Sequence, residues 1–400
     1  MKAGEPGRPG LGVAGNGAPA PCVVHACPRD VLWVHGADAV SFLQGQCTQD
    51  VVARAAGETT GTLVLEPDGK LGYAARVTRV GPEEVLVDVE SGFGEGLLGR
   101  LRRFAIRTRC TFESQTWTMT SFRGEIPGRP WGVAGASELG SSPLSWIEGP
   151  DGSGAVARAG DGWPVALVAH VGSPGWPGLD VVAPEGSEVA RAVLEATGAV
   201  PVSRQAWEAA RIEAGVPAMA SELVPGTLAA ETGLLADTVS FTKGCYTGQE
   251  LVERMASRGA APPRRLAVVE VAGTAGRAGE PPEGASAPGE PLEDAWAPGQ
   301  PWWEAEPDRL VGAGLWATGP PSGPDRPAAA GGPVDPGATG ARPAGTITSA
   351  AWSARRGRVV ALAFVGRALP TPGDVLVGPR DAGGAPEWLL VGTVRDARPS

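Results

Sequence analysis

The stretch FTKGCYTGQELVERMASRG, residues 241–259, carries the densest chemical signal in the chain. Thr247 followed three residues later by Glu250 is a capping box, which predicts a helix from about Gly248 to Arg258. Cys245 then lies just before a helix N-terminus, where the dipole, the exposed amides and Lys243 favour thiolate over thiol. The stretch predicts a reactive cysteine, weighed evenly against a small buried cysteine in a turn.

A second motif, ARIEAGVP at residues 210–217, closes a helix that starts after Ser203 and ends at Gly215. Glu213 falls in its last turn, where the helix dipole disfavours a carboxylate. A ligand with two parallel N–H donors, such as a 2-amino-4-oxo pyrimidine edge, would suit an ionised carboxylate. From position alone, an exposed glutamate or one paired with Arg211 or Arg204 is the favoured interpretation.

Two further stretches are less specific. In FLQGQCTQD, residues 42–50, the side chains of Gln46, Thr48 and Asp50 either line a pocket or serve capping and turns, and the second use is favoured. A basic stretch either meets a polyanion or forms a solvated helix end and edge strand. Its members are Arg100, Arg102, Arg103, Arg107 and Arg109.

Glycine and proline, 60 and 39 of 400 residues, gather near residues 1–20, 124–163 and 271–342. We expect a disordered leader, a surface insertion and a disordered insert there. The net charge of −10 comes mostly from eight acidic residues between positions 280 and 308. The remaining body is therefore near neutral, so direct nucleic-acid binding is not expected, although local basic patches are compatible with it.

Cysteine usage and hydropathy indicate the compartment. The five cysteines form no CxxC pair and the three histidines fit no zinc or hydrolase motif, so we expect free thiols and no metal site. No run of about eighteen apolar residues is present, and the N-terminus has no apolar region typical of a secretion signal. These features predict a cytoplasmic protein that does not enter a membrane.

Apolar patterning gives the fold class. Up to about residue 262, strands and helices alternate without a regular βαβ period, which favours α+β. Expected helices cover Ala39–Gln44 with Asp38 as cap, Ser91–Phe104, and a segment from Ser187 to Thr197. Beyond Pro263 only short strands follow, which predicts a β-barrel. The expected division is a leader 1–20, an α+β region 21–262 and a barrel domain 263–400.

These motifs together resemble the YgfZ family of folate-binding proteins, which share the fold of the glycine cleavage T-protein. KGCYTGQE at 243–250 is close to that family's signature, and RIEAGVP, FLQGQCTQD and GTITS at 345–349 support it. The resemblance implies a three-part ring of two ferredoxin-like α+β lobes and a C-terminal β-barrel around a tetrahydrofolate pocket. It also implies support of iron–sulfur cluster assembly or repair in client enzymes, some of which modify tRNA.

The resemblance also assigns roles to residues. Cys245 matches the signature cysteine, taken as the catalytic group, and Glu213 matches the pteridine-binding glutamate. Arg254 and Arg258 are implied contacts for the folate glutamate tail. The other implied folate-binding residues are Arg211, Lys243, Tyr246, Gln249 and Glu250.

One departure separates the chain from true T-proteins. Their acidic pair is replaced by Gly72 and Tyr73 in DGKLGYAAR, residues 68–76. Aminomethyl transfer is therefore not expected, and a folate-dependent one-carbon transferase would have to use Asp68 or Asp88. A third hypothesis is a non-catalytic adaptor that binds RNA or protein through the arginines at 100–109, with a steep dependence of affinity on salt.

Overall fold

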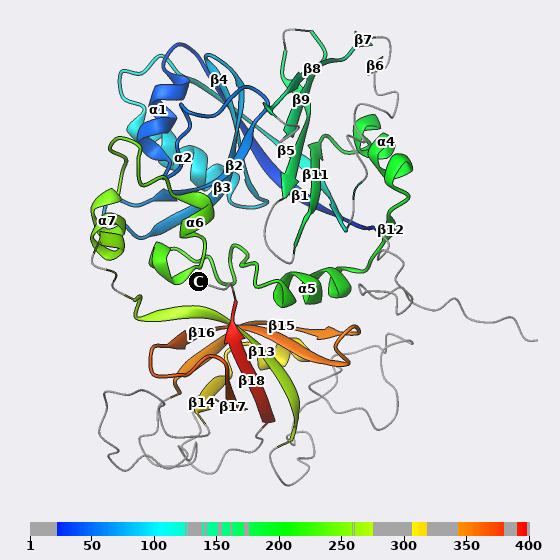
Figure 1. Cartoon of the computed structure of the whole chain (residues 1–400). Helices are drawn as coiled ribbons and strands as arrows, with labels where there is room; N and C mark the ends of the chain where they lie inside the picture. The colour runs from blue at the N-terminus through cyan, green and yellow to red at the C-terminus, as the bar shows by residue number, and fades with distance from the viewer. Residues whose placement is uncertain are drawn as a thin grey trace, which may run out of the picture.

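The computed structural model describes residues 22–124, 126, 138–139, 142–150, 154–160, 162–171, 176–257, 259, 261–274, 306–317, 343–379 and 390–397. In this part of the chain a large sheet with its helices lies on one side and a closed barrel on the other, with helix α5 (Arg204–Glu213) between them (Figure 1). The expected leader 1–20 and most of the expected insert 271–342 fall outside the described residues, although Gly314–Ala317 of that insert form a strand of the barrel. Much of the expected insertion 124–163 is described, and it contributes the strands Ser145–Glu148 and Gly154–Arg158 to the large sheet rather than lying only on the surface.

Ten strands form a single sheet, in the order β2-β3-β4-β1-β5-β11-β10-β9-β8, with β12 beside β1. Their bounds are β1 Val23–His35, β2 Thr59–Leu65, β3 Leu71–Gly81, β4 Glu84–Glu90, β5 Thr111–Arg123, β8 Ser145–Glu148, β9 Gly154–Arg158, β10 Pro164–Val171, β11 Gly178–Ala183 and β12 Val200–Pro201. A separate two-stranded pair joins β6 (Glu138–Leu139) to β7 (Ser142–Pro143). Because β5 pairs with β1 on one side and β11 on the other, both lobes share one hydrogen-bonded sheet.

The first lobe packs two helices on one face of this sheet. Helices α1 (Ala39–Gln46) and α2 (Gly94–Phe104) bury apolar side chains in one cluster with strands β1 to β4. Asp38 is the N-cap residue of α1 as predicted, but its side chain makes no cap bond and instead pairs with Arg109 at 2.8 Å. Helix α2 begins at Gly94, later than the expected start at Ser91. Asp30 accepts hydrogen bonds from the amides of Gly92 and Gly94 at this helix end.

Two helices of the second lobe follow most of their sequence signals, although Ser187, at the N-cap of α4, makes no side-chain cap bond. Helix α4 (Glu188–Thr197) ends at Gly198, whose φ of +58° is the left-handed conformation expected of a glycine C-cap. In α5, the Ser203 hydroxyl oxygen accepts a hydrogen bond from the amide of Ala206, as predicted. The apolar face of α5 packs Ala209 and Ile212 against the barrel.

The C-terminal strands close into a barrel in the order β13-β16-β15-β14-β17-β18, which confirms the β-barrel prediction. Their bounds are β13 Arg264–Thr274, β14 Gly314–Ala317, β15 Gly345–Ser353, β16 Arg358–Gly366, β17 Gly373–Gly378 and β18 Leu390–Asp396. Small and β-branched side chains from the strands fill its core. A short 3₁₀ helix, Pro307–Leu310, precedes β14.

The other described helices follow α5 and precede β13 in the sequence. They are a 3₁₀ turn at Ala229–Glu231, α6 (Leu235–Thr238) and α7 (Gln249–Ser257). A search of the described helices finds none long and apolar enough to cross a membrane.

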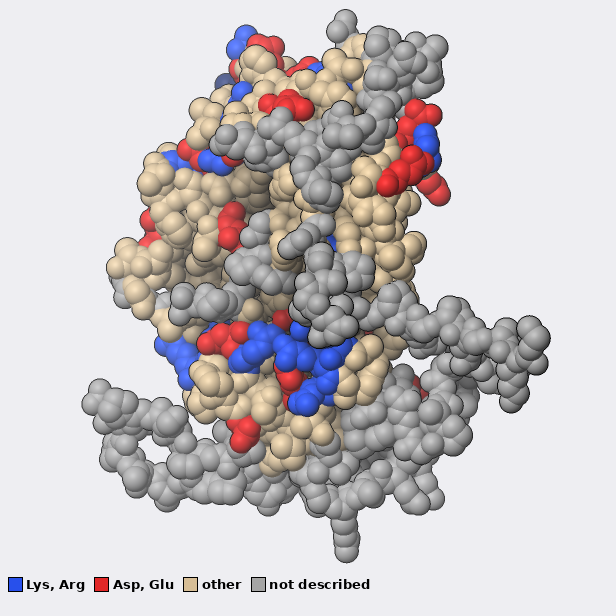
Figure 2. Space-filling view, turned by 45° about the vertical axis from the view of Figure 1, so that its right-hand side comes forward, with Lys and Arg blue, Asp and Glu red and all other residues tan. Residues whose placement is uncertain are grey.

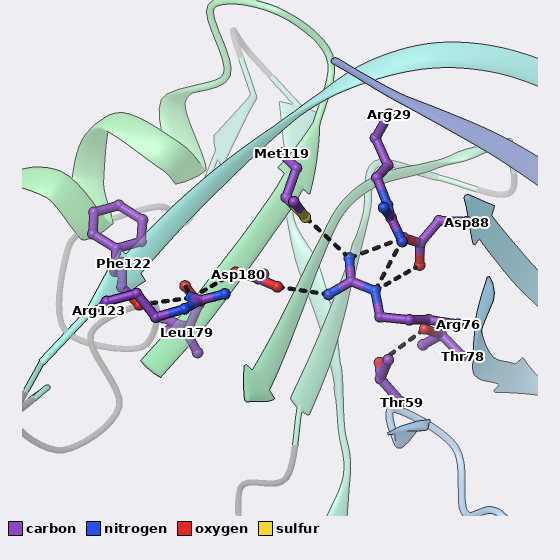
Figure 3. A network of polar contacts seen from close by, with 10 residues as sticks. All are labelled: Arg29, Thr59, Arg76, Thr78, Asp88, Met119, Phe122, Arg123, Leu179 and Asp180. Atoms are coloured by element: carbon purple, nitrogen blue, oxygen red, sulfur yellow. Dashed lines mark hydrogen bonds and ion pairs between the residues drawn. The ribbon is translucent and has the colours of Figure 1, made fainter. Parts of the chain in front are cut away.

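A buried ionic network joins the strands at the junction of the lobes (Figure 3). Arg76 on β3 contacts both Asp88, at 2.9 Å, and Asp180, at 2.7 Å. Arg29 also contacts Asp88, at 2.6 Å, and Arg123 also contacts Asp180, at 2.8 Å. Burial alone would raise the pKa of Asp180, but the guanidinium groups of Arg123 and Arg76 outweigh it and lower the pKa to about 2.

Candidate functional site

The loop 241–248 is held on the first lobe by Lys243. Its ammonium group donates to the carbonyl oxygens of Gln44, Cys47 and Gln49, at 2.6, 2.7 and 2.9 Å. These carbonyls lie at the C-terminal end of α1, where backbone acceptors have no partner within the helix. Because an ammonium group has three N–H donors, Lys243 has none left for Cys245. Lys243 therefore anchors the loop, and its N–H donors are not directed at the Cys245 thiol.

A close backbone approach fixes the other end of this loop. Gly248 has a φ of +80°, and a Cβ atom added there would lie 2.6 Å from the carbonyl oxygen of Glu66 in the β2–β3 turn. The amide of Thr247 also donates to the carbonyl of Gly45 at 3.0 Å. The loop KGCYTG thus lies against both α1 and the β2–β3 turn, which only a glycine at position 248 permits.

The capping pattern of α7 differs from the prediction. The helix begins at Gln249, and the Gln249 side-chain oxygen accepts from the amide of Tyr246 at 3.2 Å. The Thr247 hydroxyl turns instead to Gly45, and Glu250 is almost fully exposed beside Arg254, 3.6 Å away. The Thr247–Glu250 capping box is therefore wrong, and Glu250 and Arg254 form an exposed i, i+4 pair on the helix surface. Arg258 lies outside the described residues.

Cys245 is the exposed cysteine among the five. Cys22 and Cys47 are buried, Cys27 and Cys110 are partly buried, and burial raises the pKa of the Cys47 thiol to about 11. The next residue, Tyr246, points the other way into a core with Leu65, Leu71 and Met219. Its hydroxyl is buried without a hydrogen-bond partner in the described part of the chain, and burial raises its pKa to about 12.

Arg211 lies in a buried polar cluster between α5 and the barrel. Its guanidinium group contacts Glu208, the carbonyl of Val216 at 2.6 Å and the Glu222 carboxylate at 3.2 Å. Glu222 is fully buried and also accepts from Ser349 of β15 at 2.5 Å. The alternative pairing of Glu213 with Arg211 is therefore wrong. Glu222 was missed by the sequence reasoning, although an acid in the otherwise apolar segment AMASELVP was a usable signal.

Glu213 lies on the barrel side of α5. Its carboxylate contacts the Ser353 hydroxyl and the Arg355 guanidinium group, and Arg356 lies 3.8 Å away. Only 9% of its side chain is exposed. The interpretation of an exposed glutamate is wrong, because the arginines of the β15–β16 turn compensate a carboxylate at an unfavourable helix end.

A second carboxylate, Glu90, was not anticipated. It ends β4, and one of its oxygens accepts from the amide of Met219 at 3.0 Å. Burial raises its pKa, an effect only partly offset by that amide and by the nearby charges of Arg29 and Arg211. Its position at the end of the apolar strand VLVDVE, after the buried Asp88, was the signal available in the sequence.

The acids named for one-carbon transfer occupy very different places. Asp88 is fully buried between Arg29 and Arg76, which outweigh burial and hold its pKa below the usual value. Asp68 is exposed in the β2–β3 turn, 2.9 Å from Lys70. Tyr73 packs against α2 near Gly96. A transfer acid has to be reachable by the ligand and yet shielded from bulk water. Asp88 is buried and not accessible, and Asp68 is exposed, so neither aspartate meets both conditions.

The two weaker motifs serve structure. Thr48 donates to the carbonyl of Thr238 at 2.6 Å and Gln46 accepts from Arg100 at 3.0 Å, so these two side chains join remote segments. Asp50 accepts from the amide of Ala53 at 3.0 Å, as the turn interpretation expects. Arg100 is 2% exposed, whereas Arg102 and Arg103 are exposed on α2. The five arginines at 100–109 thus do not share one accessible face.

Segment 216–224 links the predicted site residues. It supplies Glu222 to Arg211, the amide of Met219 to Glu90, and Met219 and Leu223 to the core around Tyr246. Among the described residues no contact joins Cys245 to Glu213 directly. No group of three or more described His, Cys, Asp and Glu side chains is placed to hold a metal ion.

Comparisons with known proteins agree with this architecture. No protein-family model matches the chain. It is 27% identical over 238 residues to an uncharacterized protein of Haemophilus influenzae, covering 58% of this chain and 67% of that protein. It is 28% identical over 243 residues to the tRNA-modifying protein YgfZ of Yersinia pestis, covering 60% and 68%. The solved glycine cleavage system aminomethyltransferase T from Bartonella henselae matches with a TM-score of 0.60 at 16% identity, covering 94% of this chain and 86% of that one.

Proposed function

We propose that this chain, which is a YgfZ-like protein with the fold of a glycine cleavage T-protein, binds a tetrahydrofolate and supports iron–sulfur cluster assembly or repair. Its clients would include enzymes that modify tRNA, in line with the name of the Yersinia relative. We place it in the cytoplasm, where thiols stay reduced. The observation that carries the proposal is the exposed Cys245 on a loop anchored by Lys243.

Cys245 would act as a single thiol. One cysteine cannot hold a cluster, so it would either ligate iron or sulfur transiently beside ligands of the client, or resolve a damaged thiolate. Lys243 and Arg211 direct their donors at protein acceptors, and we propose them as positioning residues. Lys243 holds the Cys245 loop in place, and Arg211 holds the segment that carries Glu222 and Met219.

Three groups of the chain suit a folate. Tyr246 has a buried hydroxyl without a protein partner, and Glu90 has one carboxylate oxygen engaged by an amide and the other without a hydrogen bond from the described residues. Glu213 keeps unused acceptor capacity on both oxygens, because each ionised carboxylate oxygen accepts about two hydrogen bonds. Gln249, Glu250, Arg254 and Arg258 are the further residues that the family resemblance assigns to this ligand. Folate itself supplies one-carbon chemistry when bound.

Calorimetric titration with tetrahydrofolate tests the ligand. Wild type and Cys245→Ala are expected to bind alike, because the thiol is exposed and its loop is held by other contacts. Glu213→Ala is expected to lose binding, with Glu90→Gln as a comparison that separates the two carboxylates. Unchanged binding in both glutamate variants would show that tetrahydrofolate does not bind at Glu213 or Glu90.

The role of Cys245 needs a separate test. Cells that lack the endogenous protein would be complemented with wild type or Cys245→Ala, and the activity of a cluster-dependent tRNA-modifying enzyme measured. Loss of client activity, with the variant present at normal abundance and still binding folate, supports the proposal. Full client activity with Cys245→Ala would contradict the proposed role of Cys245.

A further inference from the structure

Four arginines gather on the barrel beside the C-terminal end of α5. Arg355, Arg356 and Arg358 lie in and after the β15–β16 turn, and Arg395 lies near the end of β18. Figure 2 shows basic side chains concentrated at this level, where the barrel meets the lobes. The side chains of the first three are 44%, 37% and 43% exposed. We call these four residues the barrel patch.

The charge of the barrel patch is only partly compensated. Glu213 contacts Arg355, and the carboxylate of Glu270 lies 3.3 Å from Arg356 and 3.7 Å from Arg358. Arg395 donates to the carbonyl of Glu213 at 2.6 Å, which neutralises no charge. Burial and the neighbouring guanidinium groups of Arg356 and Arg395 lower the pKa of Arg355, and burial lowers the pKa of Arg395, an effect that Glu270 opposes and Arg356 adds to. With Asp374 in the adjoining cavity counted, four guanidinium groups face three carboxylates, and the exposed arginines leave an excess of positive charge that attracts anions.

A cavity of about 360 Å³ opens directly beside the barrel patch. Arg395 belongs to both, and Glu270, which pairs with Arg356 and Arg358 of the patch, lines the cavity with Asp374, Pro372 and Gly373. This volume lies within the usual range of about 300–1,000 Å³ for small-molecule pockets. A single ligand could therefore contact the arginines and fill the cavity together.

We propose that the barrel patch and this cavity bind single-stranded nucleic acid, with phosphates on the arginines and one unpaired base in the cavity. Guanidinium groups match phosphate oxygens with two parallel hydrogen bonds. The carboxylates of Glu270 and Asp374 accept from the N–H groups that bases present. An acidic peptide would bring its carboxylates against those of Glu270 and Asp374. A nucleotide can instead place its phosphate on the arginines and the N–H donors of its base on these two carboxylates. A duplex keeps its bases paired and has none to insert.

The test is fluorescence anisotropy of the full chain with a labelled twelve-nucleotide RNA of mixed sequence, between 50 and 200 mM salt. For three to four phosphate contacts, the slope of log affinity against log salt should be about −2 to −3. Arg356→Glu/Arg358→Glu should weaken binding more than about tenfold at the lower salt. The matched control Arg102→Glu/Arg103→Glu makes the same change in net charge on exposed residues of α2 and should retain binding within about threefold.

Far-UV circular dichroism and thermal unfolding establish that both variants fold, and Arg358→Gln removes one charge without reversing it. Three results overturn the proposal. One is the absence of salt-dependent binding by wild type, and another is an equal loss of affinity in the two double variants. The third is equally tight binding of a duplex of the same sequence, since a base in the cavity requires an unpaired strand.

Discussion

The ammonium group of Lys243 donates a 2.7 Å hydrogen bond to the carbonyl oxygen of Cys47, across 196 positions of sequence. This contact joins the two motifs that the sequence presents as separate signals, KGCYTGQE and FLQGQCTQD. Because Lys243 also holds the carbonyls of Gln44 and Gln49, one side chain closes the end of α1 and positions the loop of the exposed cysteine.

Replacing Lys243 by methionine should therefore loosen that loop. The change leaves three carbonyls without their charged donor, and a loss of about 2 kcal/mol in the free energy of unfolding is expected. Urea unfolding measures the loss, and hydrogen exchange should report faster exchange of amides in residues 44–50 and 241–248. Lys70→Met is the matched control, because Lys70 only pairs with exposed Asp68 and its loss should have little effect. Equal losses in the two variants would contradict the anchoring role.

Thiol labelling should follow exposure. With a small disulfide reagent at neutral pH, one cysteine of the native protein should react quickly, and peptide mapping should identify it as Cys245. Cys47, fully buried and with its pKa raised to about 11, should react only when the protein unfolds. Cys245→Ser should remove the fast phase and leave the slow reactions unchanged. A fast phase that survives in this variant would place the reactive thiol elsewhere.

Asp88 and Asp68 should differ sharply in their effect on stability. Asp88→Ala leaves the buried Arg29 and Arg76 without one carboxylate partner, and a loss of about 3–5 kcal/mol is expected for breaking such a network. Asp68→Ala removes an exposed pair with Lys70 and should change stability little. Urea unfolding of both variants checks this. If amine-dependent folate turnover were found and Asp68→Ala abolished it while the protein stayed folded, the transferase hypothesis would return.

Glu90 should make stability fall as pH rises. Its pKa is raised in the folded protein, mainly by burial, so the folded state holds its proton to higher pH than the unfolded chain does. The stability that this carboxyl contributes is complete below its unfolded pKa and is lost as pH rises through the folded value. Glu90→Gln keeps an oxygen for the amide of Met219 and removes the titration. Compared with wild type, it should gain stability from pH 5 to pH 8 in urea unfolding, and an opposite trend would contradict the assignment.

Local signals predicted much of the fold. Ser203 caps α5 and Gly198 ends α4 as expected, because a hydroxyl acceptor at an N-cap and a left-handed glycine act within a few residues of the helix end. The change to short strands after Pro263 predicted the barrel, because alternating apolar residues need a closed or packed sheet to bury them. The side chains of Asp38 and Thr247 do not make the predicted cap bonds, because they contact Arg109 and the carbonyl of Gly45, which lie far away in the sequence.

The sequence by itself determined which residues could carry chemistry and what fold class would hold them. Cys245, Glu213 and the arginines stand out by residue type and position alone. Only the tertiary structure decided their partners: Lys243 turns to α1, Glu213 to the β15–β16 turn, and Arg100 to the interior. The physical reason is range. Helix ends and strand patterns depend on neighbours within a few residues, whereas the pairing of a charged side chain depends on which remote segment the packed core brings beside it.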